Sequence, residues 1–255
     1  MPRGPQTHYW PTNVPHMINE NKGIQSVERA MMILETIAAA EGEIRLVDLA
    51  AQSGLHKSTL HGLLNTLAAM GYIARRGTHY ALGLRLREIA QPLNDADALL
   101  REAFAPALLS LAERSGETCF LAAPCGTREY LYMDALEGSG NLRVASPRGR
   151  RAGLTTSAIG KIFLAFDEDL RRSLRRADLL PAELEIELAG IVTHGYALDL
   201  EGAEPGLNCV ALPLRLQGRV VAALGVAAPA SRLPKTTLCT LANHAMREMF
   251  DMLKL

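Results

Sequence analysis

The segment GLHKSTLHGLLNTLAAMG, residues 54–71, constrains the fold more than any other stretch of the sequence. Its large apolar residues recur at helical spacing: Leu60, Leu63, Leu64, Leu67 and Met70. One face of a helix that begins near Ser58 is therefore expected to pack inward. The opposite face is small and polar and consists of Lys57, Ser58, Thr59, His61, Gly62 and Asn65. Because this face carries no acidic group that repels phosphate and no bulky apolar group, it fits the major groove of DNA.

The residues before this polar helix predict a helix-turn-helix. A long amphipathic helix that ends near Gly42 is indicated by Ile24, Val27, Met31, Leu34 and Ile37. A second, short helix follows over residues 46–50. Gly54 then supplies the backbone freedom that a tight turn between two helices requires.

A β-hairpin is predicted directly after the polar helix, which Gly71 ends. The strands YIARR and HYAL alternate about Gly77 and Thr78. Three helices followed by such a hairpin make a winged helix-turn-helix. Basic residues of the hairpin could reach phosphates or the minor groove: Arg75, Arg76 and His79.

The distribution of charge supports a DNA partner, although the formal net charge of the chain is zero. A whole-chain average can hide a local field. Residues 44–90 contain six basic residues and only two acidic residues, Asp48 and Glu88. The positive charge is concentrated around the polar helix, so we expect double-stranded DNA as a partner.

Composition limits the other classes of partner. No apolar run approaches the roughly 20 residues that cross a bilayer, and the N-terminus lacks the apolar core of a signal peptide, so we expect a cytoplasmic protein without a membrane partner. Residues 1–22 hold four prolines and little apolar periodicity, which predicts a flexible tail. The four cysteines lack a CxxC pair and suggest free thiols, without a metal site. We expect no cofactor.

The pattern changes after the winged domain, which we place at residues 23–83. Helical spacing over residues 84–100 predicts a linker helix, and Pro92 and Pro106 predict a break before a second domain, residues 101–255. Strands are expected at ETCFLAA, EYLYMDAL, NLRVAS, CVALPLRL and RVVAALGVAAP, and helices at TTSAIGKIFLAF, in the arginine-rich run 171–176 and from about Pro234 to Leu253. The expected class is α+β, with helices flanking a curved antiparallel sheet.

Two parts of the chain resemble the isocitrate lyase regulator (IclR) family of bacterial transcription factors. The first is LVDLAAQSGLHKSTLHGLLNTLAAMGYIARRGTHYALG, and the second set comprises SGET, TTSAIGKIFLA, GYALDLEGAEPGLNCVALPL and GRVVAALGVAAP. The resemblance implies a DNA-binding winged domain and an effector-binding domain of the GAF or profilin-like type. It also implies a homodimer or homotetramer on a pseudo-palindromic operator, and a small organic acid or aromatic effector.

The resemblance further implies which residues line the effector pocket: Ala158, Ile159, Asp199, Cys209, Gly225 and Ala227. Relatives that bind small polar oxoacids tend to have serines on the last strand, where this chain has Gly225 and Ala227. A wider and less polar pocket is therefore expected, which favours an aromatic or longer carboxylate. In the polar helix, Gly62 stands where many relatives have an arginine that could bind guanine.

Several residues admit a second interpretation. The polar helix face is, by itself, equally compatible with a solvated surface, and Ser58 could cap its helix. Asp199 could brace the loop EGAEPG instead of touching a ligand. Cys209 could act with Asp199 in an enzyme, although no histidine and acid stand at recognisable spacing around it. The basic residues of 148–151 could attract an anion. A structural DNA-binding protein with a vestigial sensor is a third class, and a ligand-responsive regulator, not an enzyme, is the favoured one.

Overall fold

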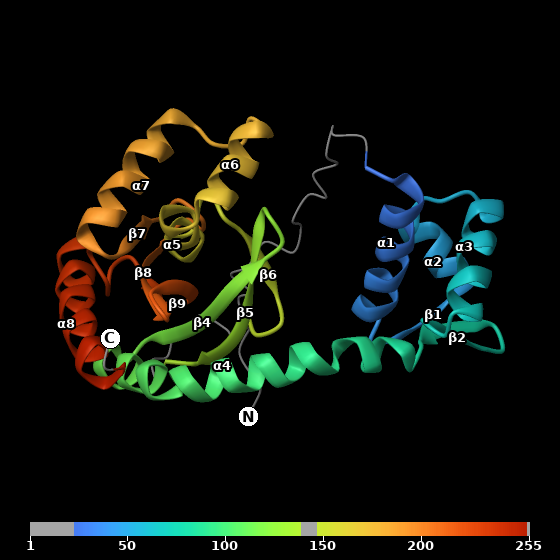
Figure 1. Ribbon diagram of the computed structural model, residues 1–255, viewed down its shortest axis with the longest axis horizontal. Coiled ribbons are helices and arrows are strands. Elements are labelled where there is room, and N and C mark those ends of the chain that lie inside the picture. Colours follow the sequence, from blue (N-terminus) through green and yellow to red (C-terminus); the bar gives the residue numbers. More distant parts are fainter. Residues whose placement is uncertain (1–22, 139–146, 254–255) are drawn as a thin grey trace, which may run out of the picture. The chain divides into compact units, whose positions relative to one another are not determined.

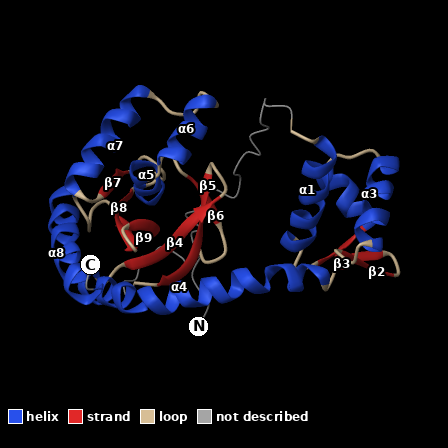
Figure 2. Cartoon of the chain, in the orientation of Figure 1, coloured by secondary structure: helices blue, strands red, loops and turns tan. Residues whose placement is uncertain are grey.

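The computed structural model describes residues 23–138 and 147–253. They divide between two units, one that ends at Asp97 and one that begins at Ala98. Each unit has its own antiparallel sheet, and Figures 1 and 2 show the elements of both. Separate hydrophobic cores accompany the two sheets, so each unit has its own source of stability.

The first unit is a winged helix-turn-helix, as predicted. Its elements are α1 (Gln25–Ala39), β1 (Glu43–Arg45), α2 (Leu46–Ser53), α3 (Lys57–Ala69), β2 (Ile73–Arg76) and β3 (His79–Leu82). The strand order is β1-β3-β2, so β1, which the sequence pattern did not predict, extends the hairpin into a three-stranded sheet. Gly54 ends α2 with a φ of 63°, and this left-handed conformation turns the chain into α3.

Helix α3 buries the face that its apolar spacing predicts. Leu60 and Leu64 are fully buried, and Leu67 is 6% exposed. Met70 is an exception at 55% exposed, because α3 ends at Ala69 and Met70 lies beyond its last turn. Burying each leucine stabilises the unit by roughly 1.5–3 kcal/mol. This packing fixes α3 with its polar face outward.

The long amphipathic helix predicted before α2 is α1, and of the five apolar residues that indicated it Ile37 lies in the core. Ile24, Val27 and Met31 are each more than half exposed, and the fully buried residues of α1 are Ile33 and Ile37. Helical periodicity identifies residues that share a face, but it does not say what that face packs against. The N-terminal turns of α1 therefore expose an apolar surface that a second chain could cover.

Helix α4 (Arg85–Ser115) is continuous, so the predicted break between a linker helix and the second domain is wrong. A proline inside a helix leaves the carbonyl group four residues earlier without its donor. For Pro92 and Pro106 these carbonyls belong to Glu88 and Glu102, and all four residues are exposed. Water can therefore replace both missing donors.

The second unit is built on a six-stranded antiparallel sheet of order β6-β5-β4-β9-β8-β7. The strands are β4 (Thr118–Cys125), β5 (Glu129–Leu136), β6 (Arg151–Gly153), β7 (Ala197–Leu200), β8 (Leu207–Leu216) and β9 (Arg219–Pro229). The predicted strands at β4, β5, β8 and β9 are confirmed. The strand expected at residues 141–146 lies outside the described residues.

Helices cover both faces of this sheet. One face packs against α5 (Ala158–Phe166), α6 (Glu168–Arg176) and α7 (Ala182–His194). The other face packs against the second half of α4 and against α8 (Lys235–Leu253). Successive strand residues alternate between the two cores, as Phe120 and Leu121 on β4 do. The result is the predicted α+β layer arrangement.

Arginines of the predicted helix α6 form surface ion pairs. Arg171 pairs with Glu168, and Arg172 lies 3.0 Å from Asp169. In the basic loop before α5, Arg148 pairs with Asp134, and Arg151 lies 3.3 Å from Glu129. Carboxylates thus offset much of the positive charge that could have attracted an anion to this loop.

At Gly160 in α5, the addition of a single methyl group is expected to destabilise the fold strongly. A Cβ atom there would lie 2.4 Å from the carbonyl oxygen and 2.5 Å from the Cα of Leu154, both backbone atoms. We expect Gly160→Ala to lower the free energy of unfolding by about 1–3 kcal/mol, measured by urea denaturation.

The matched control is Gly190→Ala in α7, where the nearest atom to a new Cβ is 3.9 Å away. Alanine has the higher helix propensity, so this variant should be unchanged or more stable by up to ~1 kcal/mol. A similar loss in both variants would contradict the close approach of α5 to Leu154.

Candidate functional site

The polar face of α3 is accessible in the first unit. Its predicted DNA contacts are exposed, or half-buried in the case of Thr59: Lys57, Ser58, Thr59, His61 and Asn65. The helix begins at Lys57, and its N-cap is His56, which makes no side-chain capping bond. Ser58 therefore lies inside the first turn, and its alternative role as the helix cap is wrong. Short donors and acceptors on this face suit a major-groove surface.

The hairpin carries its two arginines next to the turn between β2 and β3. Arg75 donates from Nε to the carbonyl oxygen of Gly77 at 3.2 Å. Arg76, with 69% of its side chain exposed, lies 4.0 Å from a carboxylate oxygen of Glu43 on β1. An exposed ion pair contributes about 0–1 kcal/mol. Arg76 could therefore exchange Glu43 for a DNA phosphate at little cost.

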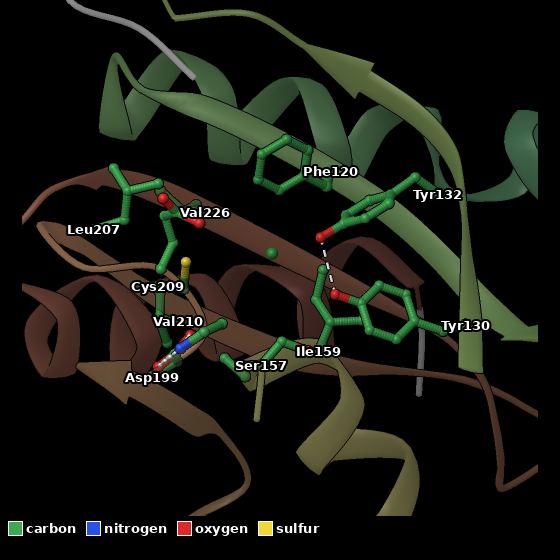
Figure 3. Close-up of a pocket in the computed structure, with 14 residues that line it drawn as sticks. Phe120, Tyr130, Tyr132, Ser157, Ile159, Asp199, Leu207, Cys209, Val210 and Val226 are labelled. Atoms are coloured by element: carbon green, nitrogen blue, oxygen red, sulfur yellow. Dashed lines mark hydrogen bonds between the residues drawn. The ribbon is translucent and has the colours of Figure 1, made fainter. Parts of the chain in front are cut away.

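The second unit encloses a pocket between its sheet and the start of α5 (Figure 3). The walls are apolar and include Phe120, Ile159, Leu207, Val210 and Val226. Polar side chains are few and include Tyr130, Tyr132, Ser157, Asp199 and Glu204. The enclosed volume is about 30 Å³, which holds about one or two water molecules. A larger ligand can enter only if side chains in the lining move.

Asp199 on β7 braces the loop that follows it. Its carboxylate accepts hydrogen bonds from the N–H of Gly202 at 2.8 Å and of Ala203 at 3.2 Å. Burial raises the pKa of Asp199, while these two N–H groups and Lys161 oppose the rise. The loop-bracing alternative is thus present in the structure, and the same side chain also lines the pocket.

Cys209 on β8 lies opposite Asp199 in the β7–β8 register. Burial raises the pKa of its thiol, and the Asp199 carboxylate raises it further. A nucleophilic cysteine needs the thiolate form, which a raised pKa disfavours at neutral pH. This environment argues against an enzyme that uses Cys209 and Asp199.

Gly225 on β9 does not widen the pocket as expected, because Ile159 fills the space above it. A Cβ atom at position 225 would lie 2.7 Å from Cδ1 of Ile159. Ala227 is buried and pairs with Cys209, but it is not among the lining residues. The other residues that the family resemblance implied lie together in the lining: Ala158, Ile159, Asp199, Cys209 and Gly225.

The sequence pattern did not identify two tyrosines of this pocket. The hydroxyl groups of Tyr130 and Tyr132 on β5 form a hydrogen bond of 2.8 Å (Figure 3). The Tyr132 ring packs edge-on against Tyr130 and Phe120, with centroid distances of 5.1 and 5.4 Å. Burial raises the pKa of Tyr130 to about 12. The period-two spacing of EYLYMDAL shows that the tyrosines share a face, but not which face holds the pocket.

Two substitutions at Asp199 separate its acceptor role from its charge. We expect Asp199→Ala to lower the free energy of unfolding by about 1–3 kcal/mol, because the N–H groups of Gly202 and Ala203 lose their acceptor. Asp199→Asn should lower the free energy of unfolding by less, since the amide oxygen of asparagine can still accept a hydrogen bond from the N–H of Gly202. Chemical denaturation at neutral pH measures both. Equal losses would show that the negative charge, and not the acceptor, stabilises the loop.

Two family models match the chain in the order of its units. The IclR helix-turn-helix domain matches residues 26–77, and the bacterial transcriptional regulator IclR C-terminal domain matches residues 96–249. The HTH-type transcriptional regulator XynR of Escherichia coli K12 is 35% identical over 84% of this chain and 90% of the relative. The transcriptional repressor IclR of the same organism is 31% identical over 82% of each chain.

Solved structures share the fold. An IclR family transcriptional regulator from Brucella abortus has a TM-score of 0.68, with 21% identity over 95% of each chain. An IclR homologue from Microbacterium hydrocarbonoxydans, complexed with 4-hydroxybenzoate, has a TM-score of 0.67. It is 22% identical and covers 90% of this chain and 99% of its own.

The fold and the matching domains define a winged helix-turn-helix transcriptional regulator with a separate effector-binding domain. More particularly, this chain belongs to the IclR family of DNA-binding transcriptional regulators. Its domains and relatives are those of regulators and not of enzymes, which removes the enzyme alternative. Among the helices that the structure describes, none is both long and apolar enough to span a membrane.

Proposed function

We propose that this chain is a one-component cytoplasmic regulator that senses a small organic carboxylate, aromatic or longer. It binds a pseudo-palindromic operator in double-stranded DNA as a homodimer or homotetramer. The observation that carries the proposal is the apolar, aromatic-lined pocket of the second unit, in the same chain as the accessible polar face of α3. A chain that combines these two sites needs no separate sensor protein.

On the DNA side, α3 enters the major groove. Its base and phosphate contacts come from Lys57, Ser58, Thr59, His61 and Asn65, and Arg75 and Arg76 reach phosphates or the minor groove. Two α3 helices related by the two-fold axis of a dimer would read two equivalent half-sites. Gly62 provides no arginine for a bidentate guanine contact, so specificity rests on the shorter side chains.

The first half of α4 offers a surface through which two chains could pair. It carries apolar residues at heptad spacing, which we term the α4 seam: Leu86, Ile89, Leu93, Ala96 and Leu100. Ile89 is 52% exposed and Leu93 is 65% exposed. A repeat of apolar residues every 3.5 residues on average favours the pairing of two helices.

On the sensor side, the proposed effector contacts are Ala158, Ile159, Asp199, Cys209 and Gly225, which line the pocket, whereas Ala227 does not. The apolar walls and aromatic rings suit an aromatic acid, and the complex of one structural relative with 4-hydroxybenzoate supports this class. Ile159 has to leave the space above Gly225 to admit such a ligand. Because Ile159 belongs to the first turn of α5, its displacement would be passed to that helix.

Coupling requires the effector to bind the DNA-competent and DNA-incompetent arrangements with different affinities, since equal affinity shifts nothing. Helix α4 contributes residues to both units and is uninterrupted from Arg85 to Ser115. A change in packing around its second half can therefore reach the α4 seam without an intervening loop. We propose α4 as the element that carries the coupling.

A titration of the purified protein onto its own upstream intergenic DNA tests this proposal. The titration is repeated at several salt concentrations, with and without benzoate, 4-hydroxybenzoate, octanoate and glyoxylate. We expect specific binding that weakens with salt and that one aromatic or longer acid changes by about 5- to 150-fold. A response to glyoxylate alone would overturn the effector class. Specific binding that no acid alters would favour a structural DNA-binding protein.

A further inference from the structure

The pocket separates its polar groups into two ends. In Figure 3, Asp199 lies on one side of the cavity, and the hydroxyl groups of Tyr130 and Tyr132 lie on the other. Phe120, Val210 and Val226 contribute apolar surface to the same cavity. A ligand that satisfies this arrangement has two different polar ends and an apolar middle.

The charge of the lining determines which end suits an anion. Among the described residues that line the pocket, the charged side chains are Asp199 and Glu204, and none is lysine, arginine or histidine. The nearby Lys161 is engaged with Glu187 at 2.8 Å and with the carbonyl oxygen of Leu198 at 3.3 Å. A carboxylate near Asp199 would meet a like charge at low dielectric. Without a cation, a buried carboxylate depends on hydrogen-bond donors.

The end opposite Asp199 holds a cluster of hydroxyl groups. Tyr130 is fully buried and Tyr132 is 4% exposed, and their oxygens are 2.8 Å apart. Ser157, the N-cap of α5, also lines the pocket; its hydroxyl accepts from the N–H of Gly160 at 3.1 Å and donates to the carbonyl oxygen of Gly153 at 3.4 Å. Hydroxyl protons rotate without movement of the heavy atoms, so such a cluster can turn its donors toward an acceptor that enters the pocket.

We propose that Tyr130 and Tyr132 form the subsite that donates hydrogen bonds to the carboxylate of the effector. This inference rests on the proposed function, because it concerns the same pocket and the same class of ligand. It also orients the ligand: the carboxylate faces the tyrosines, the ring lies against Phe120 and Val226, and a donor group, such as a hydroxyl, faces Asp199. The effector is therefore an aromatic acid with a hydrogen-bond donor at the end remote from its carboxylate.

The test compares 4-hydroxybenzoate with its uncharged amide, 4-hydroxybenzamide, by calorimetry on the full-length protein. The variant Tyr130→Phe/Tyr132→Phe removes both hydroxyl groups and keeps both rings. We expect it to bind 4-hydroxybenzoate about 10- to 100-fold more weakly, because hydrogen bonds to a charged group are the strong ones. Binding of the amide should weaken less than about 3-fold, because the amide carries no charge for the hydroxyl groups to stabilise.

Tyr196→Phe is the matched control, since Tyr196 packs in the core on the other face of the sheet and not in this pocket. If the double variant does not fold, Tyr132→Phe alone supports the same comparison of acid and amide. Equal weakening of both ligands, or no weakening, overturns the tyrosine subsite and leaves the proposed function standing. If the wild-type protein binds neither ligand, the aromatic effector class is overturned, and the subsite with it.

Discussion

Reversing two charges in the variant Lys57→Glu/Arg75→Glu is expected to abolish specific operator binding, with a loss of at least ~100-fold at about 0.1 M salt. Both residues are exposed, one at the start of α3 and one in the hairpin. Each phosphate contact releases about 0.9 counterions, and a dimer loses two contacts in each chain, so the slope of log affinity against log salt should fall by about 3.6. Electrophoretic mobility shift or fluorescence anisotropy over a salt series measures both quantities.

The control for this prediction is Arg172→Glu/Arg176→Glu on α6. Both arginines are exposed in the second unit, and their reversal changes the net charge by the same amount. If the effect is local to the DNA-binding surface, the control should keep the salt slope of the wild-type protein. A similar loss in both variants would mean that overall charge, and not α3 with its hairpin, determines binding.

The second large effect is expected from Leu93→Glu in the α4 seam. In a paired seam this substitution buries two carboxylates, which either costs several kcal/mol or separates the chains. We expect a monomer at micromolar concentration by sedimentation, and a loss of operator affinity of at least ~100-fold, because each half-site is then bound alone. The isolated fold should survive, since Leu93 is 65% exposed within one chain.

Ala98→Glu is the matched control in the same helix. Ala98 is exposed and lies on the side of α4 opposite the seam in the heptad pattern, five residues after Leu93. The Ala98→Glu variant adds the same charge as Leu93→Glu, but its carboxylate does not lie between paired helices. A Leu93→Glu protein that remains dimeric and binds its operator normally would show that the chains associate through another surface.

The local sequence pattern predicted the helices and strands whose own apolar residues recur at helical or strand spacing. In α3, three leucines at helical spacing are buried, as expected, because a helix with one apolar stripe has only one stable way to face its core. In α1 the same type of pattern correctly predicted a helix and includes the buried Ile37, but Ile24 and Val27 are exposed in the single chain. The sequence records that a face is apolar, but not whether its partner is the same chain or another.

The break predicted in α4 failed for a different reason. Proline at positions 92 and 106 removes a donor wherever it occurs, but the cost depends on whether water can reach the carbonyl left behind. Both prolines are on the exposed side of the helix. That exposure is a property of the tertiary structure, so the local sequence could not reveal it.

For the pocket too, individual residues could be predicted, but the contacts between elements distant in the sequence could not. The family resemblance pointed to Ile159, Asp199 and Gly225, and these lie together in the lining. It could not show that Ile159 occupies the space left by Gly225, because that contact joins α5 to β9. Tyr130 and Tyr132 were missed because a strand pattern assigns them to a face without saying what the face encloses.

One molecule is expected to couple a carboxylate pocket to a DNA-binding surface. The most direct test is to measure the dissociation constant of 4-hydroxybenzoate by calorimetry with and without a saturating operator duplex. Linkage requires the duplex to change the affinity for the acid by the same factor, about 5 to 150, by which the acid changes the affinity for the duplex. We predict equal factors in the two experiments. An affinity for the acid that is identical in the presence and absence of the operator would show that the pocket and the DNA-binding surface are not coupled.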